Sequence, residues 1–581
     1  MPLPILVLLR YFAYQNNKVI KRYLTLTTHT DSLTTPWWKG ASIYQIYPRS
    51  FCDFNSDGMG DIKGICSKLS YISSLGVDAM WVSPFFPSPM TDFGYDVSEY
   101  RNVDPLFGNI DDFKELLSKA HELGIKVIID QVWSHTSDQH AWFQESRKSR
   151  DNEKADWYVW ADPKDDGSPP NNWLSLFGGR AWTWDSRRQQ YYFHNFLTSQ
   201  PDLNFHNPLV RQAQLDNGRF WLELGVDGFR LDVVNFYYHN ESLIDNPAIA
   251  VGAARTLAVS HDNPYGLQQH INDITQPENI LFLEQFRSML NEYEQVTSIG
   301  EISDDNPLSV MSNYTSGGNK LHMAYTFDLL SDEFGPEYVR KVIRQIEGSI
   351  GDGWPCWAAS NHDVVRHNSR WGEGLGEEFA KVTLALLFSM RGSVCLYQGD
   401  ELGLPQSDVP FESIQDPYGV PFWPEYKGRD GCRTPMPWDG SEGAGFSSEI
   451  PWLPLNDEHK RLSVANQEQN KNSVLEFTRR FIRWRKQQPA LIHGHIELIE
   501  ETGEMLYQIL AKLKTRNKII LLSSHILHSL TNICDKISYL ENKKIRSTYS
   551  QSNFPELENK LKEMVNKKIG NQLDNLMETQ G

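Results

Sequence analysis

The chain has few cysteines, and they do not form the pairs typical of a zinc site or a disulfide framework. The six lie scattered over 581 residues, without a C-x-x-C pair, at Cys52, Cys66, Cys356, Cys395, Cys432 and Cys534. Because disulfide-dependent domains carry paired cysteines, this usage favours a reducing, cytoplasmic setting.

Long apolar runs are also missing. A membrane-spanning helix needs about 20 consecutive apolar residues, and the apolar run within Met1–Arg10 is much shorter. That segment also lacks the basic region and the small-residue cleavage site of a signal peptide. We therefore expect a soluble protein.

Positive charge is scarce as well. The net charge is −18, whereas nucleic acids and anionic membranes are bound by clustered Lys and Arg. The composition therefore argues against both kinds of partner.

Aromatic residues, by contrast, are abundant and unevenly placed. All 18 tryptophans lie between Trp37 and Trp484, and the segments outside that range are net basic although the whole chain is acidic. Such shifts mark domain boundaries. We predict a poorly ordered extension over residues 1–36, a main unit over 37–490 and an atypical tail over 491–581.

Within the main unit, short apolar runs alternate with helical patterns. Eight runs are candidate strands: 43–46, 79–82, 126–130, 226–232, 296–301, 323–327, 356–360 and 394–397. Continuous apolar strands separated by helices are typical of parallel sheets. Eight βα units predict an α/β fold of the (β/α)8, or TIM-barrel, type.

Two long insertions interrupt this pattern. Residues 136–205 are polar and aromatic, and they predict a small B domain after the third strand, between barrel segments 37–135 and 206–490. Residues 403–472 follow the eighth strand. Both would leave the barrel at the carboxyl ends of the strands, where active sites of such barrels lie.

Three carboxylates stand at three of these strand ends: Asp232, Glu301 and Asp363. Retaining hydrolysis of a glycosidic bond uses two carboxyl groups, a nucleophile and an acid/base, and a third can stabilise positive charge. Arg230 lies two residues before Asp232, on the same side of its strand. We expect Arg230 to lower the pKa of Asp232, and partial burial to raise that of Glu301.

The strand-end segments resemble the motif regions of the α-amylase superfamily, glycoside hydrolase family 13. Three further segments are similar to its α-glucosidase and oligo-1,6-glucosidase branch: Trp37–Phe51, Gln200–Asn204 and Arg429–Trp438. The resemblance extends from Trp37 to about residue 500.

The resemblance implies a role for each candidate residue. Asp232 would be the nucleophile, Glu301 the acid/base and Asp363 the transition-state stabiliser. Sugar contacts would come from Asp92, Tyr95, His135, Arg230, His362 and Arg429. In exo-acting members an Asp and an Arg like Asp92 and Arg429 hold the non-reducing end. The chain departs from the pattern at Ser134, where the family usually has Asn.

A second group of oxygen-bearing residues lies in one loop, at Asp53, Asn55, Asp57, Met59 and Asp61, with Gly58 at the sixth position. This spacing is similar to an EF-hand loop without its closing Glu, although an Asx-rich turn is an alternative. The resemblance implies a structural Ca²⁺ (or Mg²⁺) here, and no organic cofactor.

The resemblance implies a small α-glucoside substrate of the maltose or isomaltose type. Val233 follows the nucleophile, and a valine at this position resembles the family members that act on α-1,6 bonds. One side chain, however, shifts such selectivity by only about 1–3 kcal/mol. The α-1,4 and α-1,6 preferences stay open. So do a glucosyl-transferring or isomerising relative such as trehalose synthase, a non-catalytic barrel and an inactive chimera.

The tail does not match the β-sandwich that normally follows this barrel. Residues 505–550, including Lys518–His525, resemble the end of an ABC-transporter ATPase. Because the chain contains no G-x-x-x-x-G-K-[ST] loop to hold phosphates, we expect no ATP binding.

Overall fold

The computed structural model describes residues 35–250, 259, 262–496, 498, 536–541 and 544–554. These residues belong to two units, one ending at Ile496 and one following it. The predicted extension over residues 1–36 lies outside the described residues except for its last two.

The first unit is built on eight parallel strands. In chain order they are β1 (Ser42–Ile46), β2 (Ala79–Val82), β3 (Lys126–Gln131), β7 (Gly228–Leu231), β8 (Thr297–Ile302), β9 (Met323–Thr326), β10 (Cys356–Ala358) and β11 (Ser393–Tyr397). They are hydrogen-bonded in the order β10-β11-β1-β2-β3-β7-β8-β9. A parallel bridge between Ala324 and Pro355 joins the two outer strands. The predicted TIM barrel is confirmed.

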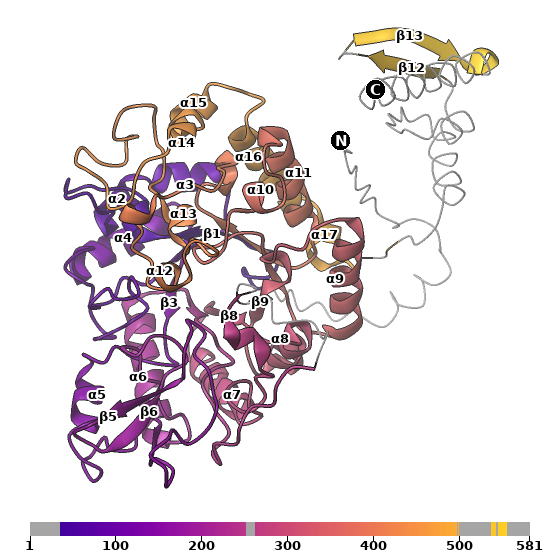
Figure 1. Ribbon diagram of the computed structural model, residues 1–581. Coiled ribbons are helices and arrows are strands. Elements are labelled where there is room, and N and C mark those ends of the chain that lie inside the picture. The colour runs from indigo at the N-terminus through magenta and orange to yellow at the C-terminus, as the bar shows by residue number, and fades with distance from the viewer. Residues whose placement is uncertain are drawn as a thin grey trace, which may run out of the picture. The chain divides into compact units, whose positions relative to one another are not determined.

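Helices surround these strands (Figure 1). They are α2 (Ile62–Ser67), α3 (Leu69–Leu75), α4 (Ile110–Glu122), α6 (Pro208–Leu224), α7 (Asn279–Leu290), α8 (Pro307–Thr315), α9 (Pro336–Ser349), α10 (His367–Arg370), α11 (Gly376–Ser389), α16 (Val474–Lys486) and α17 (Pro489–His493). Local sequence explains α4 well, because Asn109 and Asp112 form a capping box at its start. The helix then buries Phe113, Leu116 and Ala120 against the barrel.

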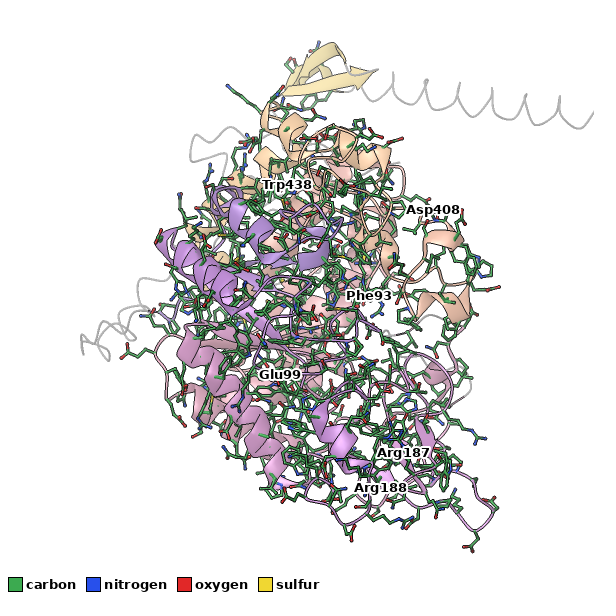
Figure 2. The ribbon with its side chains drawn as sticks, turned by 90° about the vertical axis from the view of Figure 1, so that its left-hand side faces the viewer. Phe93, Glu99, Arg187, Arg188, Asp408 and Trp438 are labelled. Atoms are coloured by element: carbon green, nitrogen blue, oxygen red, sulfur yellow. The ribbon has the colours of Figure 1, made fainter. Side chains whose placement is uncertain are left out.

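A small domain follows β3, as predicted, and it contains an antiparallel sheet. After α5 (Ala141–Ser146) it consists of β4 (Trp160–Ala161), β5 (Trp182–Asp185) and β6 (Gln190–Phe193), in the order β4-β6-β5. Its interior is aromatic, with Trp173, Trp182 and Phe193 buried together. The guanidinium of Arg188 covers the ring of Trp160 at 4.4 Å. Figure 2 shows Arg188 at the end of the unit opposite to Trp438.

The insertion after β11 contains only short helices among its described residues: α12 (Gly419–Phe422), α13 (Asp430–Arg433), α14 (Asp457–Arg461) and α15 (Val464–Glu468). Trp438 anchors it to the first βα unit, with ring centroids 5.1 Å from Phe51 and 5.1 Å from Tyr71. This anchoring fixes the preceding residues Arg429 and Arg433 relative to the barrel.

The second unit contains an antiparallel pair of strands, β12 (Lys536–Glu541) and β13 (Lys544–Ser550). The predicted ATPase-like strand over Lys518–His525 lies outside the described residues. The missing β-sandwich and the fragment over residues 505–550 therefore stay predictions. In the described part of the chain, no helix is both long and apolar enough to cross a membrane.

Candidate active site

A cavity of about 560 Å³ opens among the carboxyl ends of the barrel strands. Its size is in the range of pockets that bind small molecules. Seven of the nine predicted catalytic and sugar-binding residues line it: Asp92, Tyr95, His135, Asp232, Glu301, Asp363 and Arg429. The other two, Arg230 and His362, are buried and lie outside the set of lining residues.

Arg230 connects the carboxylates of three neighbouring strands. Its Nη1 donates to Asp130 Oδ1 at 2.8 Å and to Asp232 Oδ1 at 2.6 Å. Its Nη2 lies 2.6 Å from Glu301 Oε2. Since Asp232 and Glu301 contact adjacent nitrogens of one planar group, the guanidinium fixes their relative positions.

The electrostatics of this pair differ from the expectation for Asp232. Burial raises the pKa of Asp232 to about 7, although Arg230 acts in the opposite direction. The expected net lowering was wrong, because removal of the carboxylate from water outweighs one guanidinium that Asp130 and Glu301 share. For Glu301 the expectation is confirmed, since burial raises its pKa to about 7.

Asp363 has the opposite environment. Burial raises the pKa of Asp363, but His362, Arg429 and Arg433 lower it by more than burial raises it. The net pKa therefore lies well below the usual range. Nη2 of Arg433 is 2.9 Å from Asp363 Oδ1, and Nε2 of His362 is 3.1 Å from Asp363 Oδ2. His362 itself stacks on Tyr95 at a centroid distance of 5.1 Å. Asp363 is thus held as an anion at the wall of the cavity.

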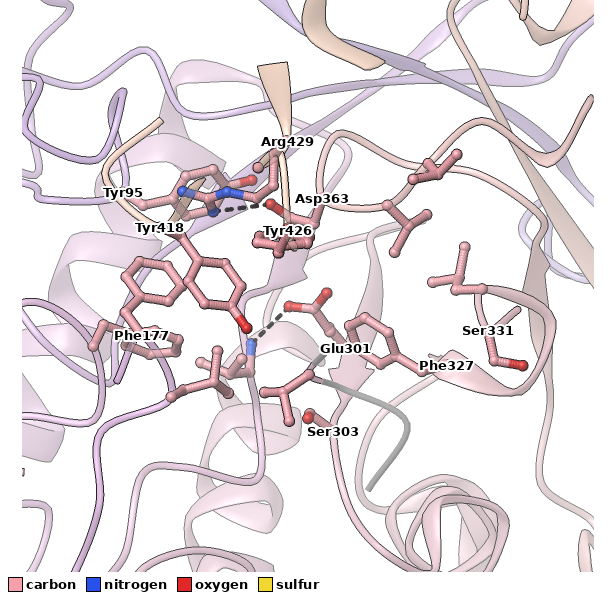
Figure 3. A pocket seen from close by; sticks show the side chains of 18 of the residues that line it. Tyr95, Phe177, Glu301, Ser303, Phe327, Ser331, Asp363, Tyr418, Tyr426 and Arg429 are labelled. Carbon is pink, nitrogen blue, oxygen red and sulfur yellow. Dashed lines mark hydrogen bonds and ion pairs between the residues drawn. The ribbon is translucent and has the colours of Figure 1, made fainter. Parts of the chain in front are cut away.

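Arg429 lines the cavity and contacts three carboxylates. Its Nη2 donates to Asp92 Oδ1 and to Asp416 Oδ1, both at 2.7 Å, and its Nη1 donates to Asp363 Oδ1 at 3.1 Å. Figure 3 shows the last contact as a dashed line. Asp416 also accepts from the Arg429 backbone at 2.7 Å. This end of the cavity is therefore dense in fixed charges.

His135 lies on the wall of the same end. Its Nε2 is 3.0 Å from the carbonyl oxygen of Tyr95, and its Nδ1 is 2.9 Å from Ser134 Oγ. A carbonyl oxygen only accepts, so Nε2 carries the proton and the Ser134 hydroxyl donates to Nδ1. Ser134 thus orients the imidazole although it replaces the usual Asn.

The opposite side of the cavity combines apolar and polar side chains. Phe327, Leu330, Val364 and Val365 line it, together with Ser331, Asp332, Glu333 and Arg370. In Figure 3, Phe327 lies on the far side of Glu301 from Tyr95 and Arg429. Glu301 therefore lies between Arg429 and Phe327.

The predicted metal loop lies apart from this cavity. Asp61 caps α2 by accepting from the Gly64 N–H at 2.6 Å, and Asp53 accepts from Gly58 N–H at 2.9 Å and Ser447 Oγ at 2.6 Å. Gly58 has a φ of 87°, so the sixth position takes the left-handed turn that such loops need. No group of three or more His, Cys, Asp or Glu side chains among the described residues is close enough to hold a metal ion. The oxygen donors suit a hard cation.

Comparison with known proteins assigns the family. Residues 45–494, which are most of the chain, match the family described as "Alpha amylase, catalytic domain". The chain belongs to the α-amylase family. This agrees with the resemblance seen in the sequence and with the barrel and its inserted sheet.

Within the α-amylase family, several proteins are similar over most of their length. A protein named "Probable alpha-glucosidase" from Rhizobium meliloti is 54% identical over 490 residues, which cover 83% of this chain and 89% of that protein. The oligo-1,6-glucosidase of Parageobacillus thermoglucosidasius is 35% identical over 555 residues, covering 90% and 96%. The crystal structure of the α-glucosyl transfer enzyme XgtA has a TM-score of 0.79 and 57% identity, covering 81% of this chain and 88% of XgtA.

Three residues of this α-amylase-family site carried no assigned role in the sequence analysis. Asp130 accepts from Arg230, Tyr325 donates from its hydroxyl to Glu301 Oε1 at 2.9 Å, and Asp416 holds Arg429. Asp130 and Tyr325 lie on predicted strands, so alternation along the strand could have indicated that they face the interior. Asp416 lies in the insertion after β11, where no local pattern marks it.

Proposed function

We propose that the protein is an exo-acting, retaining α-glucosidase. It releases glucose from the non-reducing end of small α-glucosides through a covalent glucosyl intermediate on Asp232. The observation that carries this proposal is the pair of ion contacts by which Arg429 joins Asp92 and Asp363 at the wall of the cavity. Such a bridge suits the binding of a terminal sugar, whereas an endo-acting enzyme needs a cleft open at both ends.

The two carboxyl groups held by Arg230 supply the two steps of retention. Asp232, ionised, attacks the anomeric carbon while Glu301 gives its proton to the departing glycosidic oxygen. Glu301, now ionised, then takes a proton from water, which displaces Asp232 and restores the original anomer. Asp363 is ionised throughout and stabilises positive charge on the sugar ring.

Incubation of the purified protein with maltose, isomaltose and p-nitrophenyl α-glucoside tests this function. We expect glucose from at least one of the disaccharides, and no turnover of any of the three by Asp232→Asn. The ratio of maltose to isomaltose turnover assigns the linkage. Inactivity of the full chain, together with activity of a chain ending at Glu500, would instead show that the tail inhibits the barrel.

Glucosyl transfer is the second candidate function. The apolar side chains of Phe327 and Leu330 beyond Glu301 favour it, because they offer contact to a carbon-rich acceptor. The protein XgtA, which is similar to this chain, is named as a glucosyl transfer enzyme. Transfer would add the glucosyl group from Asp232 to an alcohol in place of water. Product analysis at rising acceptor concentration separates the two, because transfer yields a new glucoside and hydrolysis yields only glucose.

We also propose that the loop from Asp53 to Asp61 binds a structural Ca²⁺, with Mg²⁺ as the alternative. Support comes from its carboxylate and amide oxygens and from the left-handed Gly58. Thermal unfolding with added Ca²⁺ or with a chelator tests this.

We further propose a cytoplasmic location. The five described cysteines are all free thiols, which accords with a reducing compartment.

A further inference from the structure

Val233, directly after Asp232, has a backbone conformation that is unfavourable for its residue type. Its φ is 34°, although β-branched residues very rarely adopt positive φ. Its side chain is 7% exposed and packs with Leu176, Phe196 and Phe236 beside the cavity. Backbone strain of this kind persists only where surrounding contacts enforce it, and it concentrates at functional sites.

The strained conformation points the Val233 N–H at the acid/base. That N–H donates to Glu301 Oε2 at 3.2 Å, shown as a dashed line in Figure 3. The next residue adds a second bond, because Val234 N–H donates to the carbonyl oxygen of Glu301 at 3.0 Å. The chain that leaves the nucleophile therefore contacts both the carboxylate and the backbone of Glu301.

Asn235 extends this connection. Its Nδ2 donates to the carbonyl oxygen of Ser303 at 2.7 Å, and its Oδ1 accepts from the Ser303 N–H at 3.2 Å. The side chain is completely buried, and its Nδ2 also donates to Thr275 Oγ1 at 2.8 Å. Residues 233–235 thus form four hydrogen bonds to residues 301–303.

We propose that Val233 and Asn235 are positioning residues that hold Glu301 at a fixed separation from Asp232. The inference rests on the proposed function, in which Asp232 and Glu301 act together on one glycosidic bond. Asp232 and Val233 are joined by a peptide bond. A movement of Asp232 therefore also moves the Val233 N–H, which donates to Glu301. Val233 thereby acts through its backbone as well as through the side chain that lines the cavity.

The test compares two substrates that differ in their need for a proton. Methyl α-glucoside has a poor leaving group that requires protonation, whereas p-nitrophenyl α-glucoside releases a weakly basic phenolate that requires little. Misplacement of Glu301 should therefore lower kcat/KM for the methyl glucoside about tenfold or more relative to the p-nitrophenyl glucoside. We expect this change of ratio in Asn235→Ala and Val233→Gly, but not in Val233→Thr, which keeps the branched side chain.

A pH profile provides the second readout. Because the Val233 N–H stabilises the ionised form of Glu301, its displacement should shift the alkaline limb of kcat/KM to higher pH. Asn217→Ala is the matched control, since Asn217 is a buried amide on α6 that bonds Gln214 at 3.0 Å. It should change neither the substrate ratio nor the limb.

Two failures are distinguishable. If Asn235→Ala and Val233→Gly lower both activities equally with an unmoved alkaline limb, these residues are merely structural and the inference is overturned. Glu301→Gln serves as the benchmark. If it does not reduce the methyl glucoside activity more than the p-nitrophenyl activity, Glu301 is not the acid and the proposed function itself fails.

Discussion

Nη1 of Arg230 lies 2.6 Å from Oδ1 of Asp232, and the arginine is completely buried. The same side chain contacts Asp130 and Glu301. One positive charge is thus shared among three carboxylates, so the site holds an excess of negative charge unless a proton is retained. Burial raises the pKa values of both Asp232 and Glu301, and the one shared positive charge does not offset it.

The first prediction concerns the nucleophile. Asp232→Asn should lower kcat for p-nitrophenyl α-glucoside at least about a thousandfold, because removal of a covalent nucleophile abolishes the two-step route. Asp216→Asn, at a half-exposed site on α6, is the control and should retain full activity. Equal activity of the two variants would exclude Asp232 as the nucleophile.

The second prediction concerns pH. The active form of the pair carries one proton, on Glu301, so kcat/KM should follow a bell-shaped curve with its maximum near pH 7. Gain of a second proton neutralises Asp232 on the acid side, and loss of the proton disables Glu301 on the alkaline side. Initial rates between pH 4 and pH 10 check this, and a profile that stays flat through pH 7 would contradict it.

The third prediction concerns stability and carries a defined sign. Burial raises the pKa of Glu301 from 4.5 to about 7, so the folded state binds the proton more tightly than the unfolded state does. The contribution of this bound proton to the free energy of unfolding is fully present below pH 4.5 and is lost as the pH rises through about 7. Glu301→Gln should therefore stabilise the protein at pH 8 by on the order of 3 kcal/mol and have little effect at pH 4.

Denaturant unfolding at the two pH values measures this difference. A stabilisation that is equal at pH 4 and pH 8 would show that packing, and not the buried charge, explains the effect.

The fourth prediction concerns Arg429 at the wall of the cavity. Arg429→Lys keeps the charge but loses the planar fork that contacts Asp92, Asp363 and Asp416. We expect kcat/KM to fall about a hundredfold, chiefly through KM. Arg219→Lys, in an exposed pair with Glu292 at 2.9 Å, should leave kinetics unchanged, because exposed ion pairs contribute little.

The fifth prediction separates two roles in the proposed calcium loop. Asp61 caps α2, whereas Asp57 is exposed and accepts mainly from within its own loop. In the presence of a chelator, Asp61→Ala should lower the free energy of unfolding by about 1 kcal/mol, while Asp57→Ala should have little effect. With Ca²⁺ added, both variants should show a smaller rise in Tm than the parent. An equal rise in the parent and Asp57→Ala would argue against a cation at this loop.

Sequence patterns predicted most of the barrel, because its strands are locally encoded. The predicted run 79–82 coincides with β2, and 323–327 differs from β9 by one residue. Buried parallel strands need continuous apolar residues, and Asn109 marks the start of α4 through its own side chain. The apolar spacing of Ile62, Ile65, Leu69 and Ile72 would suit one continuous helix, but the structure has α2 and α3, separated at Lys68.

The residues of the candidate site could be predicted from the sequence, but the pKa of Asp232 could not. Strand ends pointed to Asp232, Glu301 and Asp363, which all line the cavity. The raised pKa of Asp232 depends on full burial and on the sharing of Arg230. Neither is encoded near Asp232 in the sequence, because both arise from contacts between strands far apart in the chain.

The central claim is that Asp232 becomes glucosylated during turnover. A fluorinated glucosyl fluoride that forms the intermediate rapidly and hydrolyses slowly allows the adduct to be trapped, and mass spectrometry of the digested protein then locates it. The account predicts one added sugar, on the peptide that contains Asp232. A label on another carboxylate, or full inactivation without any label, would contradict it.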